Sequence, residues 1–379
     1  MYVSKSLRRY LCGIVFGLSL LIVGLAGPAS AAPPLDETHA SVRAVIALQG
    51  EVTADLMKIP EILGTAVGLD DTDAPALVVF VDRESASMAD VVRALPPKLR
   101  GIAVKVELTD KFRAFPKGSH GGPPGGGGTA VSHTAKQTTP VQLGTSGGWR
   151  NDLANGYCCG GTLGSLVQVN GIQYVMSNYH VLESDIVPGG NNLVATTGDG
   201  AVQPGLIDVG CNANNAQIVA TLVKLSSLPA SNVDVGLAQV VPGMVRTDGS
   251  ILEIGTLSSQ TVTAALSQAV KKSGRTTGLT HSYISGLNAT ISVAYENECA
   301  GGSAFTKTFT GQVVISNSRS SFLNSGDSGS LMVEDVVTSP RAVGLLYAGS
   351  STSAIANPIG QVLQFIGSKL GGSASMVGF

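Results

Sequence analysis

The feature that most constrains the fold of this chain is a Gly- and Pro-rich stretch at residues 116–140, which contains the sequence GGPPGGGG at 121–128. Such a composition buries no core and is typical of a flexible linker. The glycines are not a phosphate-binding loop, because no Gly-Lys-Ser/Thr follows them. The 379-residue chain is therefore expected to hold folded regions on both sides of this linker.

Residues 33–115, before the linker, mix helical and extended patterns. Periodic apolar residues predict helices at 40–57 and 86–95, and apolar runs predict strands at 76–81 and 102–107. We expect a small α+β domain with helices on one face of a sheet. Two roles remain open for it: a pro-segment or inhibitory domain removed by cleavage in the linker, or a permanently attached adaptor.

After residue 141 the chain changes to short β-rich runs broken by Gly, Asn and Pro. This spacing predicts an all-β sandwich or barrel over residues 141–379. One helix is expected at 358–370, where apolar residues recur at helical spacing after a proline. The expected strands are 161–169, 172–177, 218–225, 234–240, 282–293, 305–315 and 342–347.

The first 32 residues have the pattern of an export signal. Lys5, Arg8 and Arg9 precede an apolar run at 11–25, and small residues follow it up to Ala32. The run is shorter than the ~20 residues that a membrane-spanning helix needs. We therefore expect a cleaved signal peptide at 1–32, a secreted protein, extracellular or periplasmic, and no stable membrane insertion after cleavage.

Charge and motif content exclude several classes of function. The net charge is −2 and charged residues make up 13% of the chain, so there is no basic field for nucleic acid. The chain has no Cys-x-x-Cys pair and no His-Glu-x-x-His helix, so a zinc site is not expected. We expect no metal and no cofactor.

The cysteines point to an oxidising compartment. With Cys12 lost in the signal peptide, Cys158, Cys159, Cys211 and Cys299 remain, and four cysteines allow three pairings. A bridge between the adjacent cysteines would strain the peptide between them. We expect one of the two to pair with Cys211 or Cys299, and the sequence leaves the choice open.

The sharpest motif is NSGDSGS at 324–330, centred on Ser328. A serine hydroxyl is a weak nucleophile unless a base takes its proton and backbone donors stabilise the oxyanion. Flanking glycines allow a tight turn that directs the backbone N–H groups of Gly326 and Ser328 at one point. By itself the tetrapeptide GDSG is also an ordinary surface turn, but it resembles the signature of chymotrypsin-like serine peptidases.

Two further residues complete a candidate catalytic triad. His180 follows an apolar strand, where the resemblance places the general base, and Asp234 lies among apolar residues, where a buried carboxylate needs a partner. Taken singly, each is an ordinary structural residue. Their order in the chain, His180, Asp234, Ser328, is that of chymotrypsin-like enzymes and not that of subtilisins or α/β-hydrolases.

Several segments resemble bacterial trypsin-like peptidases related to the plant Narrow leaf 1 proteins. The resemblance covers roughly residues 141–370 and implies two six-stranded antiparallel β-barrels with a C-terminal helix, preceded by the small α+β domain, with the active site in the cleft between the barrels. The matching segments are GTLG at 161–164, SNYH at 177–180, SGRTTG at 273–278, GDSGS at 326–330, GLLYAG at 344–349 and IANP at 355–358.

The resulting prediction is a secreted serine endopeptidase that cleaves protein or peptide substrates through an acyl-enzyme. Two alternatives remain: a catalytically silent binding or scaffolding protein with the protease fold, and an esterase using the same triad. The oligomeric state stays open.

Substrate preference rests on residues 320–325, a few residues before Ser328, which hold no acid to pair with a lysine or arginine side chain, so a trypsin-like preference is disfavoured. Phe322, Asn324 and Gly349 are candidate pocket residues, with turn building as the alternative. Arg275 is expected to form an ion pair or a turn rather than act in catalysis. The remaining histidines, His39, His120, His133 and His281, are read as structural or solvated.

Overall fold

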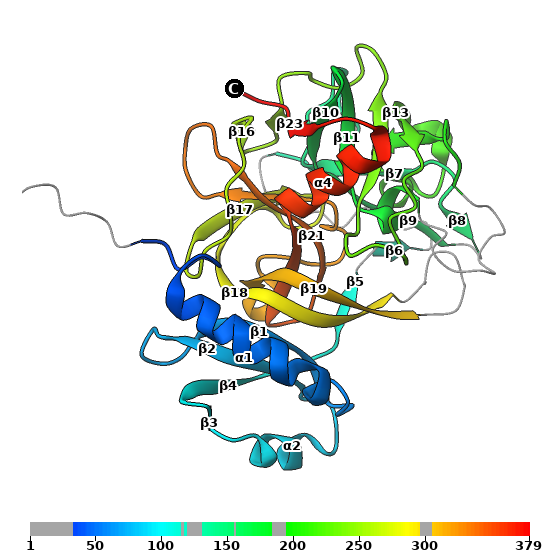
Figure 1. Cartoon of the computed structure of the whole chain (residues 1–379). Coiled ribbons are helices and arrows are strands. Elements are labelled where there is room, and N and C mark those ends of the chain that lie inside the picture. The colour runs from blue at the N-terminus through cyan, green and yellow to red at the C-terminus, as the bar shows by residue number, and fades with distance from the viewer. Residues whose placement is uncertain (1–32, 115–116, 120–130, 155–156, 184–194, 296–304) are drawn as a thin grey trace, which may run out of the picture. The chain divides into compact units, whose positions relative to one another are not determined.

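The structure is a computed structural model that describes residues 33–114, 117–119, 131–154, 157–183, 195–295 and 305–379. Strands predominate in these residues and helices are few (Figure 1). The predicted signal peptide, the glycine run at 121–128, His120 and Cys299 lie outside the described residues. No described helix is both long enough and apolar enough to cross a membrane.

The N-terminal region contains the predicted helices and strands and further strands that the sequence analysis missed, among them the two-residue strand β3. The longest of the missed strands, β1, follows α1 in the chain and is almost entirely buried. It was missed because Gly64 and Gly68 interrupt its apolar pattern. The elements are α1 (Ala40–Leu56), β1 (Ile62–Leu69), β2 (Pro75–Asp82), α2 (Met88–Ala94), β3 (Lys98–Leu99) and β4 (Ile102–Thr109).

These strands continue a sheet of the C-terminal region. β1 pairs antiparallel with β18, placing Gly64 opposite Ile291 and Val67 opposite Leu287. The 11-stranded sheet runs β17-β20-β21-β22-β19-β18-β1-β2-β4-β3, with β5 off this path, and β17 also pairs with β18. Its further strands are β5 (Phe112–Ala114), β17 (Ala269–Gly274), β18 (Gly278–Tyr295), β19 (Phe305–Ser316), β20 (Leu331–Glu334), β21 (Ala342–Gly349) and β22 (Ser353–Pro358).

A second sheet has ten strands, in the order β23-β10-β11-β14-β13-β12-β7-β9-β6, with β8 paired to β9. β15 (Ser250–Ile251) and β16 (Gly255–Thr256) form a separate two-stranded sheet. The strands of the ten-stranded sheet are β6 (Lys117–Ser119), β7 (Thr145–Trp149), β8 (Leu153–Ala154), β9 (Tyr157–Leu163), β10 (Ser165–Val169), β11 (Ile172–Ser177), β12 (Gly200–Gln203), β13 (Gln217–Val223), β14 (Gly236–Val240) and β23 (Ala374–Met376).

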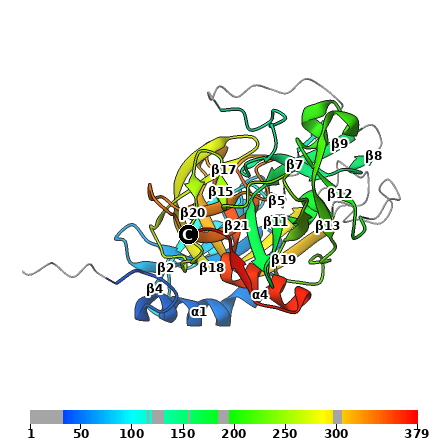
Figure 2. The same ribbon diagram turned by 90° about the horizontal axis from the view of Figure 1, so that it is seen from above.

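Helices in the C-terminal region are short. α4 (Ile359–Leu370) is the predicted C-terminal helix, and it begins directly after Pro358. α3 (Tyr179–Leu182) was not predicted, because one turn is too short for a periodic pattern. Figures 1 and 2 show α1 and α4 on the same side of the sheets. The 3₁₀ turns are η1 (Leu206–Val209), η2 (Ala213–Asn215) and η3 (Ser318–Ser320).

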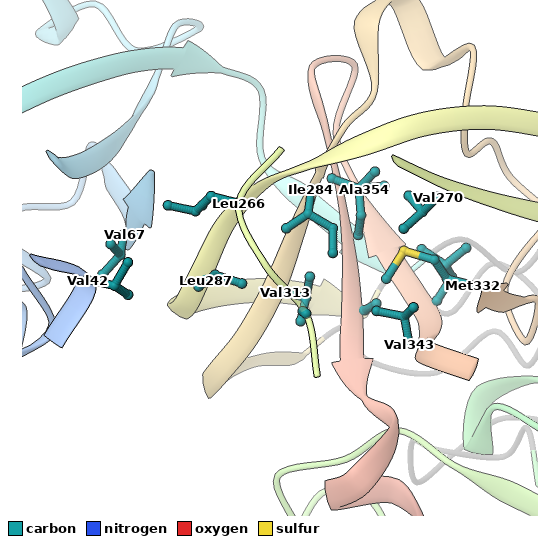
Figure 3. Packing of buried hydrophobic residues seen from close by; sticks show 14 of the residues in the cluster. Val42, Val67, Leu266, Val270, Ile284, Leu287, Val313, Met332, Val343 and Ala354 are labelled. Atoms are coloured by element: carbon teal, nitrogen blue, oxygen red, sulfur yellow. The ribbon is translucent and has the colours of Figure 1, made fainter. Parts of the chain in front are cut away.

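One hydrophobic core joins the N-terminal region to the 11-stranded sheet. Val42 of α1 and Val67 of β1 belong to the same buried cluster as Ile284, Val313 and Met332 (Figure 3). Apolar area removed from water contributes roughly 25 cal/mol per Å². Separating the two regions would therefore expose apolar surface on both.

Parts of the stretch predicted as a linker have bonding partners. Residues 117–119 form β6, which pairs with β9. His133 is buried, its Nδ1 lies 2.7 Å from the carbonyl oxygen of Gly144 and its Nε2 lies 2.6 Å from Oε2 of Glu253, a structural role as predicted. A Gly- and Pro-rich composition therefore does not prevent these flanking residues from bonding to the folded regions.

Cys158 and Cys211 form a disulfide that closes 53 residues of chain. This pairing is one of those left open by the sequence analysis. Cys159 is also disulfide-bonded. The bridge holds β9 to the chain just after η1, next to the second sheet.

Candidate active site

Asp234 lies at the centre of the candidate site, two residues before β14, and is fully buried. Its Oδ1 accepts the backbone N–H of Tyr179 at 2.8 Å. Its Oδ2 lies 2.6 Å from Nδ1 of His180 and accepts the hydroxyl of Tyr295 at 2.9 Å. These hydrogen bonds offset the free-energy cost of burying a carboxylate, which is otherwise several kcal/mol.

His180 is held on α3, three residues after β11 ends, so it lies on a single helical turn and not on the strand itself. Its ring is buried and meets the ring of Tyr295 edge to face, with 6.0 Å between the ring centroids. The side chain of Asn178, just before the turn, donates to the backbone carbonyl of Asp234 at 2.8 Å. The sequence Asn178-Tyr179-His180 therefore binds Asp234 through backbone and side chains together.

The backbone N–H of Asp234 donates to Oδ1 of Asn357 at 2.8 Å, so the second sheet bonds to β22 of the first at this point. The amide of Asn357 in turn donates to Gln312 at 2.6 Å. All three residues are fully buried. The network fixes Asp234 relative to the sheet that follows the Ser328 turn.

Ser328 lies in a tight turn that requires glycine. Gly326 and Gly329 have φ angles of +95° and +92°, in the left-handed region. A Cβ at Gly329 would also lie only 2.3 Å from the carbonyl oxygen of Thr162. The motif therefore has glycine on both sides of Ser328 for steric reasons.

The backbone around Ser328 is linked by hydrogen bonds to β9 and, through it, to β11, the strand that precedes α3 and His180. The carbonyl of Ser328 accepts the N–H of Thr162 in β9 at 2.8 Å. The carbonyl of Thr162 accepts the hydroxyl of Ser177, the last residue of β11, at 2.6 Å. Three predicted residues far apart in sequence, His180, Asp234 and Ser328, are thus brought into one bonded region, and Ser328 is only 2% exposed.

Asp327, the residue before Ser328, forms a buried ion pair with Lys272 of β17. Oδ2 of Asp327 lies 3.6 Å from Nζ of Lys272, and neither side chain is exposed. Oδ1 also accepts the N–H of Thr276 at 2.8 Å, and Oδ2 accepts the N–H of Asn324 at 3.0 Å. Burial lowers the pKa of Lys272, while the carboxylate of Asp327 raises it.

A second buried ion pair lies on the other side of the turn. Arg275 donates from Nε and Nη2 to the two carboxylate oxygens of Asp208 at 2.7 and 2.5 Å. Its backbone N–H donates to the hydroxyl of Thr162 at 3.0 Å. Such a two-pronged pair has fixed geometry, so Arg275 forms an ion pair, as the sequence analysis expected.

The predicted pocket residues lie in different settings. Phe322 is 1% exposed and belongs to the hydrophobic core, so its side chain does not line an open pocket, and the turn-building alternative fits it better. Asn324 is exposed and its side chain accepts the N–H of Ser325 at 2.7 Å. Gly349 ends β21, where a Cβ would lie 3.1 Å from the carbonyl oxygen of Ser353.

Glu183 is a buried carboxyl group at the end of α3 that the sequence analysis did not consider. It accepts the N–H of Leu225 at 2.9 Å and that of Ser226 at 3.1 Å. Burial raises its pKa to about 7, the bonds to those N–H groups oppose the rise, and Asp234 adds to it.

Sequence reasoning also missed Tyr295, Lys272 and Asn357. Tyr295 gave no signal, since a tyrosine at the end of an apolar strand is ordinary. Lys272 gave a weak sequence signal, because a lysine inside an apolar strand needs a buried partner. Among the described residues, no group of three His, Cys, Asp or Glu side chains is arranged to hold a metal.

The fold and the site together define a mostly β protein with a buried His-Asp pair next to a Gly-Asp-Ser-Gly turn. The family model for the Nal1 C-terminal domain matches residues 229–357. This match includes Asp234 and Ser328, and it supports the resemblance to Narrow leaf 1-type trypsin-like peptidases. No curated protein sequence matches the chain.

Solved structures similar to this chain are serine proteases. One is a glutamic acid-specific serine protease, with 17% identity over 62% of this chain and 100% of that chain and a TM-score of 0.40. Another is Protease A of Thermobifida fusca, with 17% identity over 63% and 99% and a TM-score of 0.38. A third is a chymotrypsin of Cellulomonas bogoriensis, with 19% identity over 63% and 99% and a TM-score of 0.39.

Proposed function

We propose that this protein is a serine endopeptidase with Ser328 as nucleophile, His180 as general base and Asp234 as the residue that orients the base. The observation that carries the proposal is the 2.6 Å contact between Nδ1 of His180 and the fully buried Asp234. A carboxylate at Nδ1 fixes the tautomer in which Nε2 is free to accept a proton. The family match and the Ser328 turn support the same assignment.

The reaction follows from these roles. His180 takes the proton of the Ser328 hydroxyl as the oxygen attacks the peptide carbonyl, and the N–H groups of Gly326 and Ser328 bind the oxyanion. The protonated His180 then gives its proton to the leaving amine, which leaves an acyl-enzyme. Water, deprotonated by His180, releases the acid and restores Ser328. No cofactor takes part.

The charges around Asp234 suit this cycle. Its partners are the backbone of Tyr179, the hydroxyl of Tyr295 and the ring of His180, and they include no Lys or Arg among the described residues. The positive charge that forms on His180 during attack therefore meets a carboxylate that no other cation neutralises.

We infer that each of the two large sheets contains one of the two antiparallel six-stranded barrels of a chymotrypsin-like peptidase, with further strands added to it. Supporting this, β17 pairs with β20 on one side and β18 on the other, so that the pairing passes through β21, β22 and β19 and returns to its start. The site residues come from both sheets. Asp234 precedes β14 of one, and Ser328 precedes β20 of the other.

We further propose secretion after cleavage of residues 1–32, with residues 33–115 remaining bound to the peptidase region. The disulfide between Cys158 and Cys211 suits an oxidising compartment. The shared core and the β1–β18 pairing support permanent attachment over removal. N-terminal sequencing and intact mass of the active secreted species test both points: a species that begins beyond residue 116 and has lost the N-terminal region contradicts attachment.

Paired peptide and ester substrates test the activity. The signal-free protein, intact and after nicking in the stretch 121–128, is incubated with an unfolded protein and with simple esters. Cleavage of internal peptide bonds that is lost in Ser328→Ala and kept in Ser321→Ala, an exposed serine of the same loop, supports the endopeptidase. Ester cleavage alone indicates the esterase, and no turnover in a folded, nicked protein indicates a binding protein.

A further inference from the structure

Two short strands lead the chain from one large sheet to the other beside the candidate site. β5 (Phe112–Ala114) pairs in the 11-stranded sheet, and β6 (Lys117–Ser119) pairs in the ten-stranded sheet. Figure 1 shows β5 beside β18 and β6 beside β9. Only residues 115 and 116 separate the two strands, so the crossing takes place within a very short length of chain.

β5 lies against the strands that carry parts of the site. It runs parallel to β18, with Ala114 opposite Tyr295, the tyrosine whose hydroxyl donates to Asp234 at 2.9 Å. On its other side it is antiparallel to β21, with Arg113 opposite Gly349.

The strand β20 leaves the edge of β21 unpaired near Gly349. β20 pairs with β21 only at residues 342–345, and Leu346 bonds to the backbone of Gly329 and Ser330, directly after the nucleophile. Beyond Leu346, β20 no longer pairs with this edge of β21, and β5 pairs with it instead. An extended peptide that reached Ser328 from this side would pair with the same edge.

β6 pairs with β9, whose next residues contact the backbone of Ser328. It is antiparallel to β9, with Lys117 opposite Gly160 and Gly118 opposite Cys159. The next residues of β9 touch the nucleophile's backbone: a Cβ at Gly161 would lie 3.0 Å from the carbonyl oxygen of Ser328, and the N–H of Thr162 donates to that oxygen at 2.8 Å.

We propose that β5 and β6 occupy the strand edges on either side of Ser328 on which an extended peptide substrate binds, so that the intact chain is autoinhibited. This inference rests on the proposed peptidase function. Proteins bind extended peptides by adding them to open strand edges through main-chain hydrogen bonds. Here the chain's own strands make these pairings, at the high effective concentration of a tethered ligand.

Relief of the autoinhibition does not require removal of the N-terminal region. That region stays bound through the β1–β18 pairing and through Val42 and Val67 in the shared core. In β5, Phe112 is fully buried and meets the ring of Phe80 edge to face with 5.4 Å between centroids. Local displacement of two short strands is therefore enough to open both edges.

A proline in β5 tests the proposal with a matched control. Arg113→Pro removes a backbone donor from β5, and Lys98→Pro does the same in β3, an edge strand that pairs only with β4. The measurements are the rate at which a fluorophosphonate labels Ser328 and the rate of peptide hydrolysis. We expect Arg113→Pro to raise both by at least about tenfold and Lys98→Pro to leave both at the wild-type rate.

Circular dichroism and thermal melting establish that each variant is folded. If Arg113→Pro does not fold, a full chain in which residues 112–119 are replaced by Gly and Ser takes its place. This chain is expected to label fast, and an added synthetic peptide of residues 110–120 is expected to slow its labelling, whereas a scrambled peptide is not. Wild-type labelling that is already fast and is unaffected by variant or peptide overturns the autoinhibition and leaves the peptidase standing. No labelling of any folded or nicked form overturns the peptidase and the inference with it.

Discussion

Asp234 and Asp327 are both fully buried aspartates beside the candidate site, and they are stabilised in different ways. Asp234 accepts from a backbone N–H, a tyrosine hydroxyl and His180. Asp327 accepts from backbone N–H groups too, but a buried cation, Lys272, lies 3.6 Å away. The first carboxylate is bound by neutral donors and the second by a permanent opposite charge.

The difference separates a catalytic carboxylate from a structural one. A carboxylate already paired with a lysine gains less from a second positive charge, so Asp327 holds the turn that carries Ser328. Asp234 is available to stabilise the imidazolium of His180 when it forms. Burial alone does not distinguish the two roles, whereas the charge of the partners does.

The largest effect is expected for Asp234→Asn. The amide places a donor towards Nδ1 of His180 and forces the wrong tautomer, so we expect kcat for peptide hydrolysis to fall by about 10⁴ with the fold retained. Asp199→Asn is the control, because Asp199 accepts the indole N–H of Trp149 at 3.0 Å and has no part in the reaction. Equal rates for Asp234→Asn and wild type would break the comparison.

Lys272→Met should act on stability. It leaves Asp327 as an uncompensated buried charge, which costs about 3–5 kcal/mol of unfolding free energy. Lys271→Met is a close control, since Nζ of Lys271 donates to a backbone carbonyl at 2.6 Å and pairs with no carboxylate among the described residues, so we expect a loss of about 1 kcal/mol. Urea unfolding measures both, and equal losses would contradict a structural ion pair.

Glu183→Gln sharpens the comparison with a third buried carboxyl group, one that forms no ion pair within the described part of the chain. Its pKa is about 7 in the folded protein against the ordinary 4.5, so between these pH values the folded state binds more protons than the unfolded state. The contribution of Glu183 to the unfolding free energy is therefore largest below about pH 4.5, and the unfolding free energy falls by up to about 3 kcal/mol as the pH rises to 7. The unfolding free energy of Glu183→Gln should lack this decline with pH. Glu84→Gln, the control at an exposed site, should keep it, and a Glu84→Gln variant that also lacks the decline would contradict the assignment.

The smallest effect is expected for Tyr295→Phe, which removes one donor from Asp234. A hydrogen bond to a charged group contributes about 1.5–3 kcal/mol, and the remaining donors keep the carboxylate bound, so we expect kcat/KM to fall about tenfold. Tyr347→Phe is the matched control: Tyr347 is equally buried, and its hydroxyl has no hydrogen-bond partner within the described part of the chain. A larger loss of kcat/KM in Tyr347→Phe than in Tyr295→Phe would contradict a role for the Tyr295 hydroxyl at Asp234.

Local patterns predicted the longer helices and several of the strands, although the run expected at 161–169 is two strands, β9 and β10. The 172–177 run is β11 and the 358–370 run contains α4, because alternation and helical spacing are local properties. The His180, Asp234 and Ser328 positions came from motif order, and the structure places them in one bonded region. Their catalytic roles remain the proposal.

Long-range pairing was beyond the sequence. Neither the joining of β1 to β18 nor the pairing of β6 with β9 leaves a local signal, since the partners are far apart in the chain. The partner of Asp327 was missed for the same reason: Lys272 lies on another strand and is identified as its partner only when the sheet is assembled. Phe322 was predicted as a pocket residue because sequence position says nothing about which side of a turn faces the core.

The measurement that tests the central claim most directly is labelling of the nicked, signal-free protein with a fluorophosphonate, followed by peptide mapping of the labelled residue. The account predicts a single adduct on Ser328 that is absent from Ser328→Ala and His180→Ala. It also predicts that Lys272→Met still labels under conditions where it is folded. A folded, nicked protein that takes no label, or labels on another serine, would contradict it.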